Sequence, residues 1–159
     1  FMACWREEDM PFHHIHGAGR DYETMRQGLS GRGLDPKDFD LRQYIYDMPT
    51  VMAAADLVLC RAGASTLSEL TATGKPAILV PSPNVTANHQ FKNAKVLSDR
   101  GGALLVEEKD CSGQKLYGMV QDLLADGAGR DRMSQAQLSL AVPTAAEDIY
   151  QALMKRMGH

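Results

Sequence analysis

Short apolar runs alternate with amphipathic stretches along most of this chain, and the alternation predicts the order of its elements. The runs Leu57–Cys60, Ala77–Val80 and Ala103–Val106 have the length and composition of strands buried in a parallel sheet. Between them, apolar residues recur at the spacing of one helix face. Alternating strands and helices indicate an α/β fold, a parallel sheet with helices on both faces.

The same periodicities and the turn residues predict the remaining elements. Further strands are expected at Phe12–His16 and Leu41–Ile45. Helices are expected from Asp21 (as cap) to Leu29, from Pro49 to Ala55, from Ser65 to a stop at Gly74, and at Asn88–Arg100, Gly113–Leu124, Arg130–Leu138 and Ala145–Met157. The last helix carries an apolar stripe of Ala145, Ile149, Leu153 and Met157. Residues 1–11 remain unassigned, and residues 12–159 are expected to form one domain.

Composition narrows the class of protein. With 159 residues, 44% apolar and 23% charged, the chain fits one soluble α/β domain. A net charge of −3 without a basic block argues against nucleic acid as a partner. Three cysteines without metal-like spacing suggest a reducing compartment, and no run is long enough to span a membrane. A start at Phe1 predicts a fragment of a longer protein.

Polar residues gather where strands end and helices begin in the stretch from Asp56 to Asn93. Ligands of open α/β sheets bind at this edge. The small-residue turn Arg61–Ala64 precedes a helix N-terminus, which suits a phosphate or diphosphate. An alternative is that Thr66 and Glu69 form a capping box that only satisfies their own helix end.

Several side chains near this turn have two interpretations. Glu69 is placed to accept hydrogen bonds from both hydroxyls of a ribose. Arg61 would neutralise a phosphate or pair with a carboxylate. Asn88, His89, Gln90 and Asn93 open the next helix, and their amides suit sugar hydroxyls, although Asn88 also fits an ordinary cap.

Two other chemistries have little support. His13, His14 and His16 suggest a metal, but no carboxylate or cysteine joins them locally, so no metal site is expected. Ser65 and Ser68 lack the G-x-S-x-G setting of a nucleophile.

Four stretches of the chain together resemble the C-terminal domain of the MurG family of N-acetylglucosaminyltransferases. They are Tyr44–Pro49 (YIYDMP), Asp56–Leu70 (ADLVLCRAGASTLSEL), Gly74–Pro83 (GKPAILVPSP) and Asn88–Leu97 (NHQFKNAKVL). The resemblance runs from about Phe12 to the end and is densest between Tyr44 and Val106.

The resemblance implies a Rossmann-like fold, one half of a GT-B glycosyltransferase. The family transfers GlcNAc from UDP-N-acetylglucosamine (UDP-GlcNAc) to lipid I, which gives lipid II for peptidoglycan synthesis. It needs no cofactor or metal and works at the cytoplasmic face of the cell membrane. The C-terminal domain holds the donor.

The resemblance also implies a role for each matching residue. Ile45 would read the uracil edge through its backbone, with Met48 lining that pocket. The diphosphate would lie along Ala64, Ser65 and Thr66, Glu69 would hold the ribose, and Gln90 with Asn93 and His89 would bind GlcNAc. The full expected donor set is Ile45, Met48, Arg61, Gly63, Ala64, Ser65, Thr66, Leu67, Ser68, Glu69, His89, Gln90 and Asn93.

Half an active site is therefore expected, inactive alone. The catalytic residues, the lipid I site and the membrane surface are expected in an N-terminal domain outside this sequence. The first strand of the C-terminal domain and its phosphate loop are also expected to lie outside it. Three alternatives stay open: a stand-alone sugar-nucleotide-binding subunit that needs a membrane partner, as in the two-subunit dolichol-pathway GlcNAc transferase; a related lipid glucosyltransferase; and a truncated chain that self-associates through an exposed sheet edge.

Overall fold

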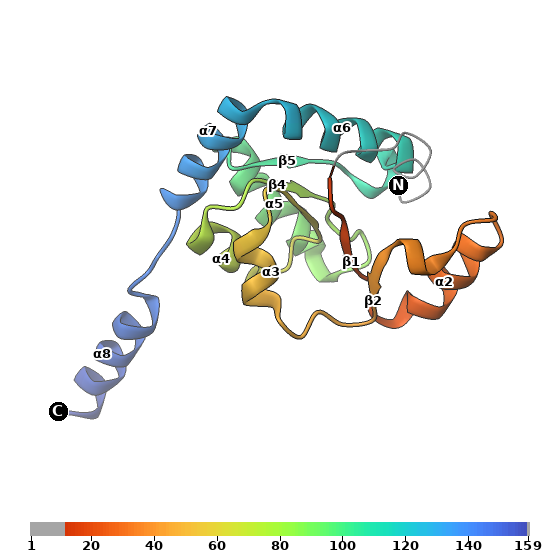
Figure 1. Cartoon of the computed structure of the whole chain (residues 1–159). Coiled ribbons are helices and arrows are strands. Elements are labelled where there is room, and N and C mark those ends of the chain that lie inside the picture. The colour runs from red at the N-terminus through yellow and green to blue at the C-terminus, as the bar shows by residue number, and fades with distance from the viewer. Residues whose placement is uncertain (1–11, 159) are drawn as a thin grey trace. The chain divides into compact units, whose positions relative to one another are not determined.

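The computed structural model describes residues 12–158, which divide into two compact units (Figure 1). The first unit runs to Ala55 and resumes at Cys111–Ala125. The second comprises Asp56–Asp110 and the chain from Asp126 onwards. Parallel strands connected by helices occur in both units, which confirms the α/β prediction.

The first unit is built on two short parallel strands. β1 (Ile15–Gly17) pairs with β2 (Asp40–Arg42), and α2 (Tyr22–Ser30) connects them. Leu29 and Phe39 are buried at its centre, and Met25, Leu34 and Leu41 pack against them. The unit also contains α3 (Met48–Ala54) and α6 (Gly113–Ala125).

The predicted strand bounds in this unit were wrong by several residues. The first strand starts at Ile15 rather than Phe12, and the second ends at Arg42 rather than Ile45. The amides of Ala18 and Gly19 still donate to the carbonyls of Arg42 and Gln43, but Gly19 has a φ of +56° and turns the chain away. The second strand therefore loses its partner after Gln43.

Two helix starts in the first unit also differ in detail from the prediction. Asp21 does occupy the N-cap position of α2, but its side chain makes no cap hydrogen bond. The preceding residues Gly19–Asp21 form a 3₁₀ turn that leads directly into the helix. Pro49 is the second residue of α3 rather than the first, because the helix begins at Met48.

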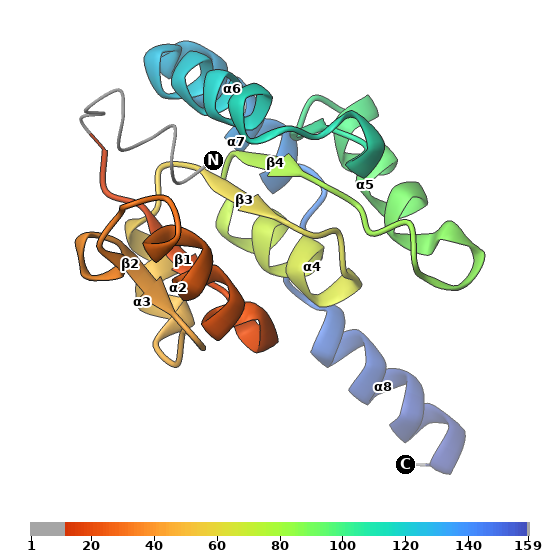
Figure 2. The same cartoon turned by 90° about the vertical axis from the view of Figure 1, so that its right-hand side faces the viewer.

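The second unit contains a three-stranded parallel sheet in the order β3 (Val58–Cys60), β4 (Ala77–Leu79), β5 (Ala103–Leu105). α4 (Ala64–Thr73) connects the first pair of strands, and α5 (His89–Asp99) connects the second pair (Figures 1 and 2). Both connections advance in the same direction, so right-handed crossovers place the two helices on one face, where they contact each other. α7 (Gly127–Leu138) contacts α4.

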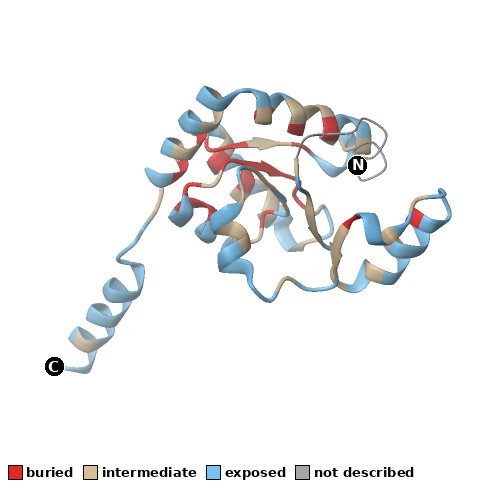
Figure 3. Ribbon diagram, in the orientation of Figure 1, coloured by how far each residue is buried: buried red, intermediate tan, exposed pale blue. Residues whose placement is uncertain are grey.

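The central strand explains the continuous apolar run in the sequence. Ala77, Ile78 and Leu79 are each 0% exposed, so every residue of β4 is buried whichever face it points to (Figure 3). Strands covered on both faces are apolar at every position, whereas half-exposed strands alternate. Leu70 and Ala94, from α4 and α5, are also fully buried in this unit.

The turns that enter β4 and β5 are held together by one buried side chain. Gln137 on α7 is 0% exposed, and its Nε2 donates to the carbonyl of Lys75 at 2.6 Å and to that of Gly102 at 2.7 Å. A buried carbonyl without a partner is costly, so these bonds fix α7 to the sheet. The fixed edge carries the amino ends of the strands.

The last helix keeps its predicted bounds, but none of its residues is buried. α8 (Ala145–Met157) exposes Ile149 to 62%, Leu153 to 57% and Met157 to 69%. Its apolar stripe therefore covers no core in this structure (Figure 3). In the part of the chain that the structure describes, no helix combines the length and apolarity needed to cross a bilayer.

Two glycines with left-handed backbones allow a test of packing at α7. A Cβ built at Gly74 (φ +63°) would lie 2.8 Å from Leu138 Cγ and 2.9 Å from Ser134 Oγ, whereas one at Gly101 (φ +75°) meets nothing within 4 Å. We expect Gly101→Ala to cost about 1 kcal/mol through φ alone, and Gly74→Ala about 2–3 kcal/mol through φ and overlap. Urea unfolding of the two variants measures the difference. Equal losses would contradict the packing of α7 on α4.

Candidate functional site

The carboxyl ends of β3, β4 and β5 meet at one edge of the second unit because the strands are parallel. Arg61 follows β3 directly, Val80 follows β4 directly, and Glu108 comes just after β5. α4 and α5 both begin at this edge. It is the place where open parallel sheets bind ligands.

The turn after β3 leads into a helix start without a side-chain cap. Gly63 is the N-cap of α4, in an extended conformation (φ −67°, ψ 149°), and it makes no side-chain cap bond. The first helical bond runs from the Leu67 amide to the Gly63 carbonyl. The amides of Ala64, Ser65 and Thr66 precede this ladder and point along the helix dipole toward the edge, an arrangement suited to an anion.

The alternative of a capping box is therefore wrong. Because the chain enters the helix at Ala64, Thr66 is the third helical residue rather than the cap. Glu69, six residues after Gly63, lies too far along the helix to bond back to the cap amide. Its side chain is exposed and available to other groups.

Glu69 also acts on the end of β3. Burial raises the pKa of the Cys60 thiol to about 11, and the negative charge of Glu69 adds to the rise. The carboxylate is thus close enough to Cys60 for its charge to be felt. Cys60 therefore stays protonated at neutral pH.

The loop before α5 has an unusual backbone. Ala87 and Asn88 both adopt the left-handed conformation, with φ of 53° and 52°. Asn88 sits at the N-cap position but makes no side-chain cap bond, so the ordinary capping alternative does not hold for it. Strained non-glycine residues of this kind concentrate at functional sites.

Gln90 has a structural contact that the sequence did not suggest. Its Oε1 accepts a hydrogen bond from the Ser82 amide at 2.9 Å, so the side chain ties the loop after β4 to the start of α5. The amide nitrogen of Gln90 does not take part in that bond. His89, the neighbour of Gln90, is exposed.

Asn93 lies next to the start of α4. Together with Ala64, Leu67, Val96 and Leu97 it lines an open hollow of about 250 Å³. The structure therefore brings a residue expected at the sugar and a residue expected at the diphosphate to the same hollow. Gln90 is not among the residues that line it.

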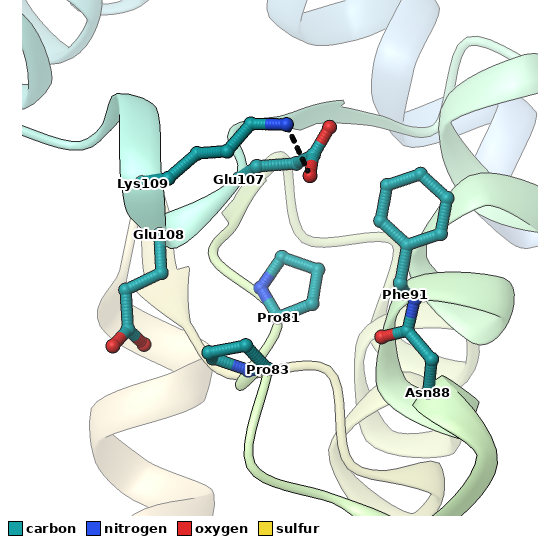
Figure 4. A pocket seen from close by; sticks show the side chains of 7 residues that line it. All are labelled: Pro81, Pro83, Asn88, Phe91, Glu107, Glu108 and Lys109. Carbon is teal, nitrogen blue, oxygen red and sulfur yellow. Dashed lines mark ion pairs between the residues drawn. The ribbon is translucent and has the colours of Figure 1, made fainter.

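A larger pocket of about 460 Å³ lies at the same edge and was missed by sequence reasoning (Figure 4). Its walls are Pro81, Pro83, Asn88, Phe91, Glu107, Glu108 and Lys109. Glu107 pairs with Lys109 at 3.2 Å on one side of it. The position of these acids directly after a predicted strand was the signal that could have found them.

Arg61 spans the strand ends. Its Nη1 donates to the carbonyl of Val80 at 3.1 Å and forms an ion pair with the carboxylate of Glu108. Of the two roles left open by the sequence, the structure displays the pairing with a carboxylate.

The remaining site residues, Ile45 and Met48, belong to the first unit. A Cβ on Gly17 would lie 3.2 Å from Ile45 Cδ1, so Ile45 packs closely against β1. Met48 is the first residue of α3 and is 40% exposed. The rings of Tyr44 and Tyr46 lie 6.2 Å apart and are largely exposed.

Two histidines of the first unit contact each other, and the third contacts a carboxylate. The rings of His14 and His16 meet edge to face at 5.5 Å, and burial lowers the pKa of His14 to about 4. His13 Nε2 lies 3.2 Å from Asp40 Oδ2, and the hydrogen bond from Arg42 lowers the pKa of that carboxyl. Within residues 12–158, no three His, Cys, Asp or Glu side chains gather as a metal site would need.

Comparison with known proteins shows which family this sequence matches. Residues 2–149 match the model of the glycosyltransferase family 28 C-terminal domain. The UDP-N-acetylglucosamine–N-acetylmuramyl-(pentapeptide) pyrophosphoryl-undecaprenol N-acetylglucosamine transferase of Anaeromyxobacter dehalogenans (strain 2CP-C) is 44% identical over 142 residues, 89% of this chain and 36% of that protein. The protein of the same name from Halalkalibacterium halodurans is 40% identical over 141 residues, 88% of this chain and 39% of that protein. The chain thus spans little more than a third of these relatives.

Solved structures agree with the fold. The crystal structure of Acinetobacter baumannii MurG matches with a TM-score of 0.75 and 27% identity, over 89% of this chain and 42% of that one. The glycosyltransferase VinC, solved with dTDP, matches with a TM-score of 0.61 at 16% identity, over 82% of this chain and 32% of that one. The second likeness concerns the fold alone. The Rossmann-like, GT-B-type prediction is confirmed.

The exposed position of Glu69 predicts a small effect on stability. Glu69→Ala should change the free energy of unfolding by less than about 0.5 kcal/mol, because the side chain neither caps α4 nor fills the core. Loss of a helix cap would cost about 1 kcal/mol. Denaturant unfolding of the variant distinguishes these two losses of stability. A loss of about 1 kcal/mol would show that Glu69 does cap α4.

Proposed function

Because the chain belongs to the family of glycosyltransferase family 28 C-terminal domains, we propose that it binds the sugar-nucleotide donor of an N-acetylglucosaminyltransferase. The donor is UDP-GlcNAc, and the whole protein transfers GlcNAc to lipid I to form lipid II in peptidoglycan synthesis. The observation that carries the proposal is the uncapped start of α4, which opens beside the pocket that Asn93 lines.

The diphosphate is assigned to the start of α4. Three backbone amides, from Ala64 to Thr66, precede the helical ladder, and Gly63 leaves no side chain in their way. Amides at a helix N-terminus bind anions through both hydrogen bonds and the dipole. We assign a structural role at this turn to Gly63, Leu67 and Ser68. They hold the turn and its helix in place and do not determine which nucleotide binds.

The sugars are assigned to the neighbouring polar groups. Glu69, the exposed sixth residue of α4, accepts from the ribose hydroxyls. Asn93, beside Ala64, and the free amide nitrogen of Gln90 bind GlcNAc, with His89 at the rim. Neutral amides suit a neutral sugar because they donate and accept without burying a charge. Ile45 and Met48 are proposed for the uracil.

Catalysis needs groups beyond the donor half. Departure of UDP places negative charge on the diphosphate, which the preorganised amides of α4 would stabilise. A base on the acceptor side would remove the proton of the attacking hydroxyl. We assign that base, the lipid I site and the contact with the inner membrane face to parts of the relatives that this chain does not cover. No cofactor or metal is required in this scheme.

Calorimetric titration of the chain with UDP-GlcNAc tests the assignment, with UDP-glucose and ADP-GlcNAc as competing ligands. We expect UDP-GlcNAc to bind most tightly. Glu69→Ala should weaken it at least about tenfold, since hydrogen bonds to a charged group contribute about 1.5–3 kcal/mol.

A matched variant controls for the loss of a carboxylate. Asp99→Ala removes an exposed acid that pairs with Lys95 at the far end of α5, and it should leave donor binding unchanged. Equal binding by wild type and Glu69→Ala would remove Glu69 from the ribose site. A folded chain that binds none of the three nucleotides would contradict the proposal that it binds donor by itself.

A further inference from the structure

We propose that Glu108 is a positioning residue for Arg61, and that it orients the guanidinium for the donor diphosphate without touching the donor. The inference rests on the proposed function of the α4 start. It concerns a residue on the loop after β5 that lies outside every stretch matched by the sequence motifs. The ion pair between Arg61 and Glu108, together with the bond from Arg61 to Val80, carries it.

The two contacts join the ends of all three strands in the sheet. Arg61 follows β3, its carbonyl partner Val80 follows β4, and Glu108 comes after β5. Both contacts use Nη1, and neither uses Nε or Nη2. One end of the guanidinium fork is therefore anchored, while the other donors of this planar group remain to be directed at a second anion.

Anchoring matters because Arg61 is otherwise unconstrained. Its side chain is 54% exposed, and an arginine of that exposure samples many rotamers unless it is held. The turn that carries Arg61 reaches the first residue of α4 within three positions. A guanidinium held across the strand ends beside that turn meets a phosphate in a geometry suited to bidentate bonds.

The neighbouring acid supplies a natural comparison. Glu107 belongs to the same loop but pairs with Lys109, and in Figure 4 the carboxylate of Glu108 points away from that pair. The two acids of this loop therefore pair with different cations, Glu107 with Lys109 and Glu108 with Arg61. Replacing either acid by glutamine removes one negative charge from the edge, which by itself favours an anionic ligand. Only the change at Glu108 releases Arg61.

The experiment compares Glu108→Gln with Glu107→Gln in titrations with UDP and with uridine. We expect Glu108→Gln to bind UDP about fivefold more weakly than Glu107→Gln. The reason is that Arg61, without its charge-assisted contact to Glu108, is no longer held in the orientation that suits the diphosphate. The two variants should bind uridine equally, because uridine has no diphosphate. A purely structural role would weaken both ligands together and lower the melting temperature of Glu108→Gln below that of its partner variant.

The UDP and uridine affinities of the two variants distinguish a positioning role of Glu108 from a structural one. Equal UDP affinity of the two variants, or tighter UDP binding by Glu108→Gln, would overturn the positioning role while leaving the donor site intact. Loss of UDP and uridine binding in parallel would overturn it in favour of a structural role. If the wild-type chain binds UDP no better than uridine, the diphosphate assignment fails, and the role of Glu108 fails with it.

Discussion

The buried central strand β4 is the constraint on which the rest of the second unit depends. Its three residues are fully buried, and β3 and β5 pair with it in parallel on either side. Parallel pairing requires a crossover helix after each strand, and both helices then start at the same edge. The site therefore follows from the sheet, because the loops that carry its polar residues all leave the strands at this edge.

The two edges of that sheet have different chemistry. At the amino ends of the strands, Gln137 satisfies two backbone carbonyls. At the carboxyl ends, the start of α4 lacks a side-chain cap, and Ala87 and Asn88 hold a strained backbone. One edge stabilises the fold, and the other is the edge to which we assign the ligand. Strain and exposed amides at the second edge are tolerated because the first edge and β4 hold the unit together.

Local patterns predicted much of this arrangement, and long-range contacts account for the rest. The element order could be predicted from the apolar runs around β3, β4 and β5 and from the helix stop at Gly74. Both signals, an apolar run and a turn residue, occupy only a few neighbouring residues. The end of β2 depends on where its partner β1 turns away, and the exposure of the α8 stripe depends on whether another element packs against it. The bond from Ser82 to Gln90 and the pairing of Arg61 with Glu108, 47 residues away, likewise have no local signature.

An amide chemical-shift titration of the chain with UDP tests whether the amides at the start of α4 receive the diphosphate. We expect Ala64, Ser65 and Thr66 to show the largest shifts with UDP, and we expect uridine at the same saturation to leave them nearly unchanged. Large shifts confined to other elements, or equal shifts of these three amides with uridine, would contradict this assignment of the diphosphate.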